Sequence, residues 1–405
     1  MARPPMGWNS WDCFGPCVTE DEVRANAAVM AERLLPHGWD TVVIDIQWYE
    51  PTAHAHGYND DAPLVLNEYG IHQPAPNRFP SAADGTGFRP LFDHLHALGL
   101  RAGLHVMRGI PKLAVARGLP IRGTAWTARD AADTSSTCAW NHDNVGLDHD
   151  HPAAQAYYDS QVATFAAWGV DFLKVDDMAA PYYSREVAAY AEAIRRSGRD
   201  IALSLSPGTR LTPEHLDHLR AHARMWRISD DLWDRWVDVR DQFDRLALWA
   251  PLQREGGWAD ADMLPLGRIG IRAERGEPRN SRLTPDEQRT LMSLWLLARS
   301  PLMMGGDLPS SAEPTFALLT NDDALAVLDA HTSAEVHRDA SLRVWRAEAD
   351  AATYVGVFCL ADEPVALDAS HWTGPRATDL WDHAPTDPTH LAIPAHGARL
   401  LRIEE

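Results

Sequence analysis

The amino-acid sequence predicts an α/β fold: a (β/α)8 TIM barrel followed by a small C-terminal antiparallel β-sandwich domain. Short apolar runs alternate with longer amphipathic segments up to about residue 320, a pattern typical of parallel strands joined by helices. About eight such units fit there, which is enough to close a barrel. After Leu328 the pattern becomes strand-like, with no helix expected and with turns rich in Asp, Pro and Gly. Because 405 residues exceed most single cores, we expect two domains, at 1–325 and 326–405.

Several elements can be assigned from local signals. A helix after Thr19 is predicted by the capping box that Thr19 forms with Glu22. A later helix is predicted by Thr284, a capping residue followed directly by Pro285. The predicted buried strands of the barrel are the apolar runs 41–45, 101–107, 170–176, 201–205 and 223–228. The predicted strands of the C-terminal domain are 342–349, 353–360 and 398–403.

Composition narrows the range of partners. The formal net charge of −20 repels nucleic acid and anionic membranes, so we expect a small, neutral substrate. No apolar run is long enough to span a bilayer, and the N-terminus lacks the pattern of a secretion signal, so we expect a cytoplasmic protein. The four cysteines are too few for a disulfide framework, although Cys13 and Cys17 could pair. The sequence leaves open whether the chain forms a homo-oligomer.

Polar residues end the predicted barrel strands. In a barrel of this kind the active site lies at the C-terminal ends of the strands. Several acids that meet at one mouth suit glycoside hydrolysis, which uses two carboxyl groups in opposite roles. The residues at these ends are Asp45, His105, Asp176, Ser206, Arg227 with Asp231, and Asp262.

Lys174 and Asp176 lie two residues apart on one predicted strand, so both side chains face the barrel interior. The ammonium group of Lys174 would lower the pKa of Asp176 and suit it to act as a nucleophile; a structural ion pair is the alternative. The second carboxyl group must hold its proton near neutral pH. The segment WRISDDLWD offers Asp230, Asp231 and Asp234 for this role, and spacing alone does not choose among them.

The chain resembles glycoside hydrolase family 27, the α-galactosidase group, over nearly its whole length. The segments that carry the resemblance are MGWNSWDCFG (6–15), VVIDIQW (42–48), WGVDFLKVDD (168–177), WADADMLPLG (258–267) and LWLLARSPLMMGGDL (294–308). The resemblance implies a retaining exo-glycosidase that requires no metal and no cofactor, with Asp176 as the nucleophile and Asp231 as the acid/base. The two carboxyl groups of a retaining enzyme lie about 5–5.5 Å apart. The residues expected to contact the sugar are Trp8, Asp45, Ile46, His105, Cys138, Lys174, Ser206, Arg227 and Asp262.

Ile46 departs from the family pattern. α-Galactosidases typically carry two consecutive aspartates where this chain has Asp45 and Ile46, and that pair holds the axial 4-OH and the 6-OH of galactose. An apolar side chain cannot accept a hydrogen bond from the 6-OH and would occupy its space, and burying that hydroxyl unpaired costs about 1–3 kcal/mol. L-Arabinopyranose keeps the ring configuration of galactose but lacks that carbon. The sequence therefore favours a β-L-arabinopyranosidase, whose bacterial subgroup the chain resembles; an α-galactosidase that tolerates Ile46 is the alternative.

Other departures leave further alternatives open. His105 stands where the family usually has a tyrosine, and Met107 where an aspartate is common. Ser206 stands near the position of a sugar-binding glutamate. A small residue there is also a feature of the related α-N-acetylgalactosaminidases, which keeps a third substrate open.

Two other classes of protein can be weighed against a glycosidase. A metal-dependent barrel hydrolase could draw ligands from the His and Asp residues of NHDNVGLDHDHP (141–152). These residues are crowded into one loop before a helix, however, and we expect Asp150 to cap that helix. A non-catalytic sugar-binding protein would not need both Asp176 and Asp231.

Overall fold

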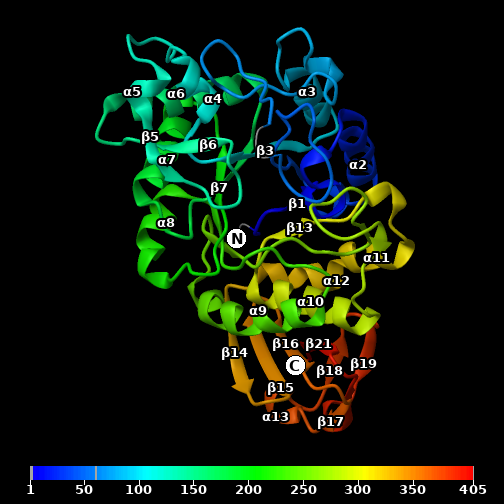
Figure 1. Cartoon of the computed structure of the whole chain (residues 1–405). Coiled ribbons are helices and arrows are strands. Elements are labelled where there is room, and N and C mark those ends of the chain that lie inside the picture. The colour runs from blue at the N-terminus through cyan, green and yellow to red at the C-terminus, as the bar shows by residue number, and fades with distance from the viewer. Residues whose placement is uncertain (1–2, 60–61, 405) are drawn as a thin grey trace.

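A computed structural model describes residues 3–59 and 62–404 of the chain. Its core is an eight-stranded parallel sheet with the strand order β10-β9-β8-β7-β3-β2-β1-β13 (Figure 1). Leu264, beyond β10, pairs with β13, and its amide donates to the carbonyl of Met303 over 2.7 Å, so the sheet closes on itself. The predicted (β/α)8 barrel is confirmed. Its strands are β1 Met6–Asn9, β2 Thr41–Ile44, β3 Arg101–Met107, β7 Phe172–Asp176, β8 Ala202–Leu205, β9 Met225–Arg227, β10 Trp258–Asp260 and β13 Leu302–Met304.

Helices cover the outside of the barrel. Strands β1 and β2 are buried at every position, which is why they appear in the sequence as unbroken apolar runs. The main helices are α2 Glu20–Arg33, α3 Arg89–Ala97, α6 Pro152–Trp168, α7 Ser184–Ser197, α8 Leu216–His222, α9 Trp236–Trp249, α10 Pro285–Ala298 and α11 Glu313–Leu319. Shorter helices are α1 Trp11–Phe14, α4 Lys112–Arg117, α5 Ala128–Ala131 and α12 Asp322–Leu325. Small antiparallel strands are β4 Ile110–Pro111, β5 Ala132–Thr137, β6 Asn144–Leu147, β11 Arg268–Ile269 and β12 Arg279–Asn280.

The helix caps agree with the sequence in two places and differ in one. The capping boxes predicted at Thr19 and Thr284 are both present. The expectation that Asp150 caps α6 was wrong. Because Pro152 occupies the first position of α6, the capping residue is His151, whose Nδ1 accepts from the amide of Ala153 over 3.1 Å.

The C-terminal region contains two antiparallel sheets, of six and of two strands, with the orders β14-β15-β16-β21-β18-β19 and β17-β20. Its strands are β14 Thr332–Arg338, β15 Leu342–Glu348, β16 Thr353–Cys359, β17 Val365–Leu367, β18 Ala377–Asp379, β19 Ala384–Thr386, β20 Leu391–Ile393 and β21 Ala398–Ile403. The structure corrects the expectation that no helix follows Leu328, because a single turn, α13 Ser370–Thr373, lies between β17 and β18.

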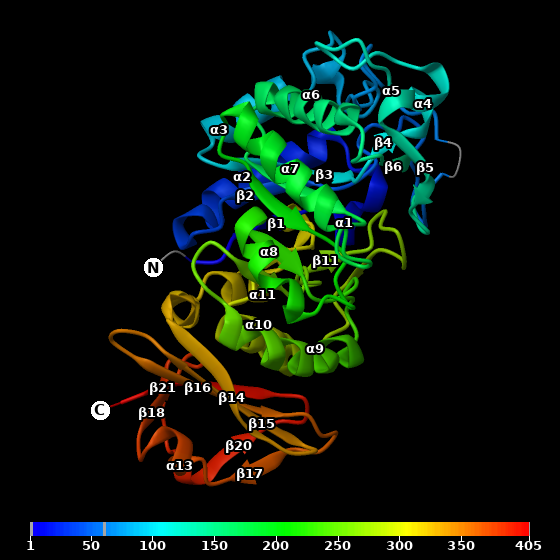
Figure 2. The same cartoon turned by 90° about the vertical axis from the view of Figure 1, so that its left-hand side faces the viewer.

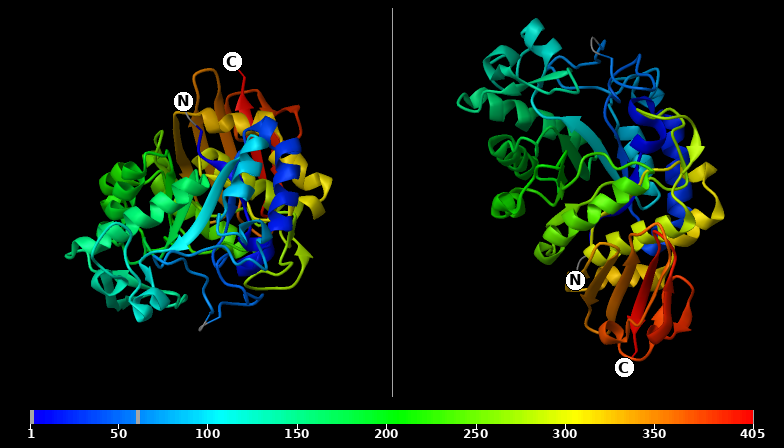
Figure 3. Two further views of the ribbon diagram at one scale, coloured as in Figure 1. Left: turned by 90° about the horizontal axis from the view of Figure 1, so that it is seen from above. Right: turned by 60° about the horizontal axis from the view of Figure 1, so that its bottom comes forward.

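The central strands β15 and β16 of the six-stranded sheet are packed on both faces, with alternate residues facing opposite sides. Val344 of β15 packs with Leu391 and Ile393 of the small sheet. Its neighbour Trp345 belongs to the main core, which also contains Leu297 of α10. Figures 2 and 3 show the sheet lying against the helix layer that includes α10. Because the two regions share this core, the boundary between residues 325 and 326 stays a prediction.

Other expectations concern cysteines and membranes. All four cysteines are free, so Cys13 and Cys17 do not pair. The thiol of Cys17 instead lies 3.2 Å from the carbonyl of Phe14. In the described ranges, no helix is long and apolar enough to cross a bilayer. The cytoplasmic location expected from the sequence stays a prediction.

His72 makes the stability of the fold sensitive to acid. Its ring is fully buried and stacks on Tyr49 with centroids 3.7 Å apart, and neither ring nitrogen has a hydrogen-bond partner among the described residues. Burial lowers the pKa of His72 to about 3. The unfolded chain takes up a proton near pH 6.5, so stability is lost as the pH falls from about 6.5 toward 3.

We predict that His72→Phe makes the free energy of unfolding less dependent on pH. Between pH 7 and pH 5, urea denaturation should show the wild type losing about 2 kcal/mol more than this variant. The control is His390→Phe, which alters a side chain that is 87% exposed and should keep the wild-type slope. Equal slopes for the wild type and His72→Phe would contradict the prediction.

Candidate active site

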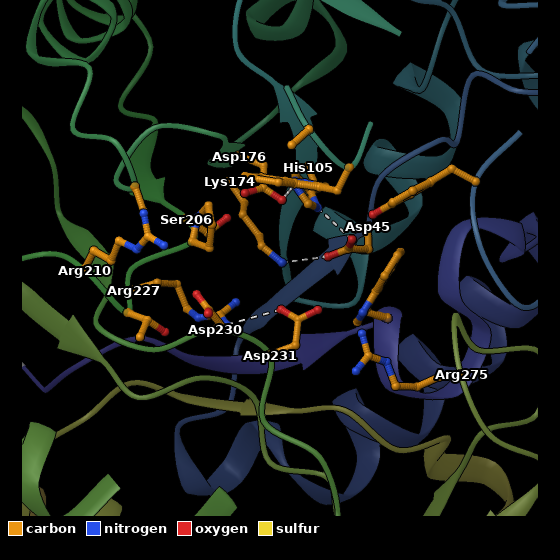
Figure 4. A pocket seen from close by; sticks show the side chains of 17 residues that line it. Asp45, His105, Lys174, Asp176, Ser206, Arg210, Arg227, Asp230, Asp231 and Arg275 are labelled. Atoms are coloured by element: carbon orange, nitrogen blue, oxygen red, sulfur yellow. Dashed lines mark hydrogen bonds and ion pairs between the residues drawn. The ribbon is translucent and has the colours of Figure 1, made fainter. Parts of the chain in front are cut away.

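A cavity of about 670 Å³ opens at the C-terminal ends of the barrel strands (Figure 4). The sequence placed polar residues at these ends, and the barrel brings most of them together. The predicted residues that line the cavity are Asp45, His105, Lys174, Asp176, Ser206, Arg227 and Asp231. Asp230, which the sequence offers only as a candidate acid, also lines the cavity. The lining residues that the sequence does not indicate are Trp11, Tyr58, Ala139, Trp140, Ala180, Pro207, Thr209, Arg210 and Arg275.

Asp45 is the centre of a buried charge network. It follows β2, and its Oδ1 accepts a hydrogen bond of 2.6 Å from His105 Nδ1. Its Oδ2 accepts from Lys174 Nζ at 3.0 Å and from Asn9 Nδ2 at 2.9 Å. Burial alone would raise the pKa of Asp45, but the charges of His105 and Lys174 hold it well below its usual value. Asp45 is therefore ionised and fixed in orientation.

Asp176 ends β7 and is also kept ionised. Its Oδ1 accepts from the amide of Asp177 over 2.8 Å, and its Oδ2 lies 3.4 Å from His105 Nε2. Burial opposes ionisation, but His105, and next Lys174, lower the pKa of Asp176 overall. The sequence assigned this effect to Lys174 alone. His105 has the larger influence because its Nε2 lies 3.4 Å from Asp176 Oδ2, whereas the ammonium group of Lys174 is hydrogen-bonded to Asp45.

His105 bridges two carboxyl groups. β3 lies between β2 and β7 in the sheet, so a residue near its end reaches both Asp45 and Asp176. Although burial lowers the pKa of His105, these carboxylates raise it overall, which favours the imidazolium form. The histidine that replaces the family's usual tyrosine thus adds a positive charge beside Asp176.

Arg227 and Asp231 form another wall of the cavity. Arg227 ends β9, and its Nη2 lies 3.3 Å from Asp231 Oδ1. Its Nη1 lies 2.9 Å from Asp262 Oδ1. The other oxygen of Asp262 accepts from the amide of Leu232 over 2.7 Å. Asp262 does not line the cavity as expected; it lies behind Arg227 and holds the backbone next to Asp231.

The structure separates the three acids of the segment WRISDDLWD. Asp234 is buried in an ion pair with Arg279, 2.6 Å away, and does not line the cavity. Asp230 and Asp231 both line it. The Asp231 side chain is 38% exposed and also touches Arg227, so it is accessible from the opening and still oriented.

Four buried polar atoms of cavity-lining residues have no hydrogen-bond partner within the part of the chain that the structure describes. They are Trp11 Nε1, His105 Nε2, Ser206 Oγ and Arg227 Nε, of which His105 Nε2 lies 3.4 Å from Asp176 Oδ2. Buried polar atoms are nearly always hydrogen-bonded, so unpaired ones in a cavity point to a polar ligand.

Trp8 does not reach the cavity. It lies within β1, fully buried, and its Nε1 donates to the carbonyl of Gly306 over 2.9 Å. Trp11 takes the expected place in the wall and stacks with Tyr58 at a centroid distance of 5.9 Å. The motif MGWNSW contains both tryptophans, and only Trp11 lies beyond the end of the strand. The rule that active residues follow strand ends would have selected it.

Ile46 and Cys138 do not line the cavity either. Ile46 is fully buried, and its amide donates to Asp45 Oδ1 over 2.9 Å. The expectation that its side chain fills the space of a hydroxymethyl group is therefore corrected. What remains is that position 46 offers no hydrogen-bond acceptor in its side chain. Cys138 is buried, and the next residues, Ala139 and Trp140, line the cavity instead.

The His and Asp residues of segment 141–152 are engaged with separate partners. Asp143 accepts from the hydroxyl of Tyr49 over 2.8 Å. His149 Nε2 lies 3.0 Å from Glu186, and His151 caps α6. In residues 3–59 and 62–404, no three His, Cys, Asp or Glu side chains are grouped so as to hold a metal ion. No observation therefore favours the metal-dependent alternative.

Comparisons with known proteins agree with this geometry. A family model described as alpha galactosidase A matches residues 144–330. The α-galactosidase of Oryza sativa subsp. japonica is 27% identical over 395 residues, which covers 94% of this chain and 79% of that relative.

Two solved structures are more similar. A Bacillus halodurans protein, provisionally named as an α-N-acetylgalactosaminidase, is 40% identical with a TM-score of 0.88, covering 99% of this chain and 97% of that one. A family 27 β-L-arabinopyranosidase of Geobacillus stearothermophilus, solved in complex with arabinose, is 45% identical with a TM-score of 0.95. That match covers 100% of this chain and 97% of the other. The chain therefore belongs to glycoside hydrolase family 27, whose members are glycosidases that retain the configuration of the anomeric carbon.

Proposed function

We propose that the protein is a β-L-arabinopyranosidase, which removes a terminal arabinopyranosyl residue from a glycoside. The observation that carries the proposal is the similarity over the whole chain to a family 27 β-L-arabinopyranosidase of Geobacillus stearothermophilus, with 45% identity and a TM-score of 0.95. Position 46 is consistent with it. The buried Ile46 next to Asp45 offers no side-chain acceptor for a galactose 6-OH, whereas arabinopyranose has no such hydroxyl.

Asp176 and Asp231 would carry out the two displacements. The carboxylate of Asp176 attacks the anomeric carbon while Asp231 gives its proton to the departing oxygen, and a glycosyl ester forms on Asp176. Asp231 then takes a proton from water while the water oxygen attacks the anomeric carbon. This step releases the sugar, frees the carboxylate of Asp176 and leaves Asp231 protonated for the next cycle. The ionised state of Asp176 and the accessible position of Asp231 support this division of roles.

Two other substrates have specific support. The names of the family model and of the rice relative favour an α-galactosidase. The small Ser206 on the cavity wall, together with the name of the Bacillus halodurans relative, favours an α-N-acetylgalactosaminidase. All three sugars share the ring configuration that the buried site would bind, so one substrate series tests them together.

We predict that the wild type hydrolyses aryl β-L-arabinopyranoside with a kcat/KM about 10- to 100-fold above that for aryl α-D-galactopyranoside, since an unpaired buried hydroxyl costs about 1–3 kcal/mol. Aryl N-acetyl-α-D-galactosaminide should be a poorer substrate than both. Ile46→Asp and Ile46→Asn, which introduce an acceptor with and without charge, should shift the ratio toward the galactoside.

Ile46→Val is the matched control, because it stays apolar and should keep the wild-type ratio. A wild type that prefers the galactoside at least tenfold would overturn the substrate assignment. The comparison of the two substrates on the wild type needs no variant, so it tests the assignment even if Ile46→Asp prevents folding.

A further inference from the structure

The cavity has room for more than the terminal sugar. Its volume of about 670 Å³ lies within the range of roughly 300–1,000 Å³ that holds drug-sized ligands, so one pentose ring leaves space. The residues that line the cavity form an inner, buried group and an outer, exposed group. The inner residues, among them Asp45, Lys174 and Asp176, are buried or half-buried and tied to one another by hydrogen bonds and ion pairs. The outer residues are exposed and belong to loops: Ala139, Trp140, Thr209, Arg210 and Asp230.

Trp140 is an apolar platform at this rim. It lies on the loop between β5 and β6, and 38% of its surface is exposed. Among the described residues, it is the one exposed large aromatic side chain, and no ring-stacking partner is found for it there. An exposed indole on a cavity wall offers a flat surface for a ligand ring.

Arg210 and Asp230 add unpaired charges to the same rim. Within residues 3–59 and 62–404, neither side chain forms a hydrogen bond or an ion pair. Arg275, the other rim arginine, is instead paired with Glu274 at 2.5 Å. Figure 4 shows Arg210 beside Ser206, with its guanidinium group turned toward the cavity.

We propose that Trp140, Arg210 and Asp230 form a subsite for a second sugar ring, the one to which the cleaved residue is attached. The proposal rests on the proposed function, because it places the terminal sugar at the inner residues. A sugar ring presents C–H groups that can stack on Trp140 and hydroxyls that can accept from Arg210 and donate to Asp230. An aryl group would use the indole but would leave both charges without partners. The net charge of −20 makes a neutral ring the better fit than an anionic one.

The test compares two substrates with similar alcohol leaving groups: methyl β-L-arabinopyranoside and a disaccharide in which β-L-arabinopyranose is linked to a hexose. The wild type should have the higher kcat/KM on the disaccharide. Trp140→Ala should lower the ratio of kcat/KM for the disaccharide to that for the methyl glycoside about tenfold, and Arg210→Ala about threefold. Trp140→Phe should recover part of the ratio. Leu248→Ala, which alters a 54% exposed side chain on α9 away from the cavity lining, should leave the ratio unchanged.

Three outcomes would overturn the subsite. One is a ratio that Trp140→Ala does not change, and another is an equal loss on both substrates, which would assign Trp140 a role in holding the inner site. The third is a loss on an aryl arabinoside without a loss on the disaccharide, which would make the rim an aryl site. A failure of the proposed function can be told apart from these outcomes. If the inner site does not bind arabinopyranose, free L-arabinose will not inhibit hydrolysis by the enzyme. The same comparison with α-D-galactosides would still test the rim.

Discussion

Asp176→Ala should lower kcat for aryl β-L-arabinopyranoside by at least about 10⁴-fold, the loss expected when the nucleophile of a covalent mechanism is removed. The cavity keeps the other groups of the site, so the substrate still binds and KM changes much less. Added azide then replaces the missing carboxylate in a single displacement. The product is a glycosyl azide with the anomeric configuration opposite to that of the substrate, which NMR identifies.

Asp231→Ala should respond differently to the same anion. General acid/base catalysis contributes about 10²–10⁴-fold, and an aryl leaving group needs little protonation, so the glycosyl ester on Asp176 still forms. Azide then attacks that ester, and two displacements give the azide with the configuration of the substrate. Asp230→Ala and Asp234→Ala, which alter the other acids of the segment, should give no azide-dependent product. If Asp176→Ala gives the retained azide, the two roles have been exchanged.

Much of this site could be predicted because barrel geometry converts sequence position into spatial position. A parallel strand buried on both faces is an unbroken apolar run, and the polar residue that ends the run lies at the mouth of the barrel. Asp45, Asp176 and Arg227 were found in this way, and all three line the cavity. The choice of Asp231 as acid/base came from the family resemblance, because three nearby acids gave no local signal.

The couplings between these residues depend on which strands are neighbours. His105 acts on Asp176 because β3 lies between β2 and β7, so its ring spans the gap between two carboxylates. Tyr58 and Arg275 come from long loops whose course no periodicity describes. The prediction that Trp8 lines the cavity was wrong because it came from the motif resemblance, which does not show where β1 ends.

A buried ion pair next to Asp176, between Arg108 and Asp177, is expected to contribute strongly to the stability of the fold. Arg108 and Asp177 are each 3% exposed, and Arg108 Nη2 lies 2.8 Å from Asp177 Oδ2. Arg108 Nε also donates to the carbonyl of Asp177 over 2.9 Å. Asp177 has a φ of 59°, in the left-handed region that costs energy for residues other than glycine. This conformation accompanies the amide hydrogen bond from Asp177 to Asp176, so Arg108 supports the residue that orients the proposed nucleophile.

We predict that Arg108→Met lowers the free energy of unfolding by about 3–5 kcal/mol at pH 8, because it leaves a buried carboxylate without its partner. Burial already raises the pKa of Asp177 to about 6 despite Arg108, with Asp176 and Glu186 adding negative charge nearby. Removing Arg108 raises that pKa further. A carboxyl group whose pKa is higher in the folded than in the unfolded chain lowers the free energy of unfolding progressively as the pH rises above about 4. The defect measured by chemical denaturation should therefore be smaller at pH 5 than at pH 8.

Two further variants separate the buried charge from other effects of losing Arg108. Adding Asp177→Asn to Arg108→Met removes the uncompensated charge with a residue that tolerates the left-handed backbone, so most of the lost stability should return. Arg185→Met is the exposed counterpart. It breaks the 2.8 Å ion pair between Arg185 and Asp150, whose side chains are 58% and 85% exposed, and should lower the free energy of unfolding by less than about 1 kcal/mol. If the double variant is no more stable than Arg108→Met at pH 8, the defect comes from the lost packing of Arg108, whose guanidinium lies 3.8 Å from the ring centre of Tyr183. If the double variant is stable but slow, the hydrogen bond from Arg108 to the Asp177 carbonyl is what holds Asp176 in its reactive orientation.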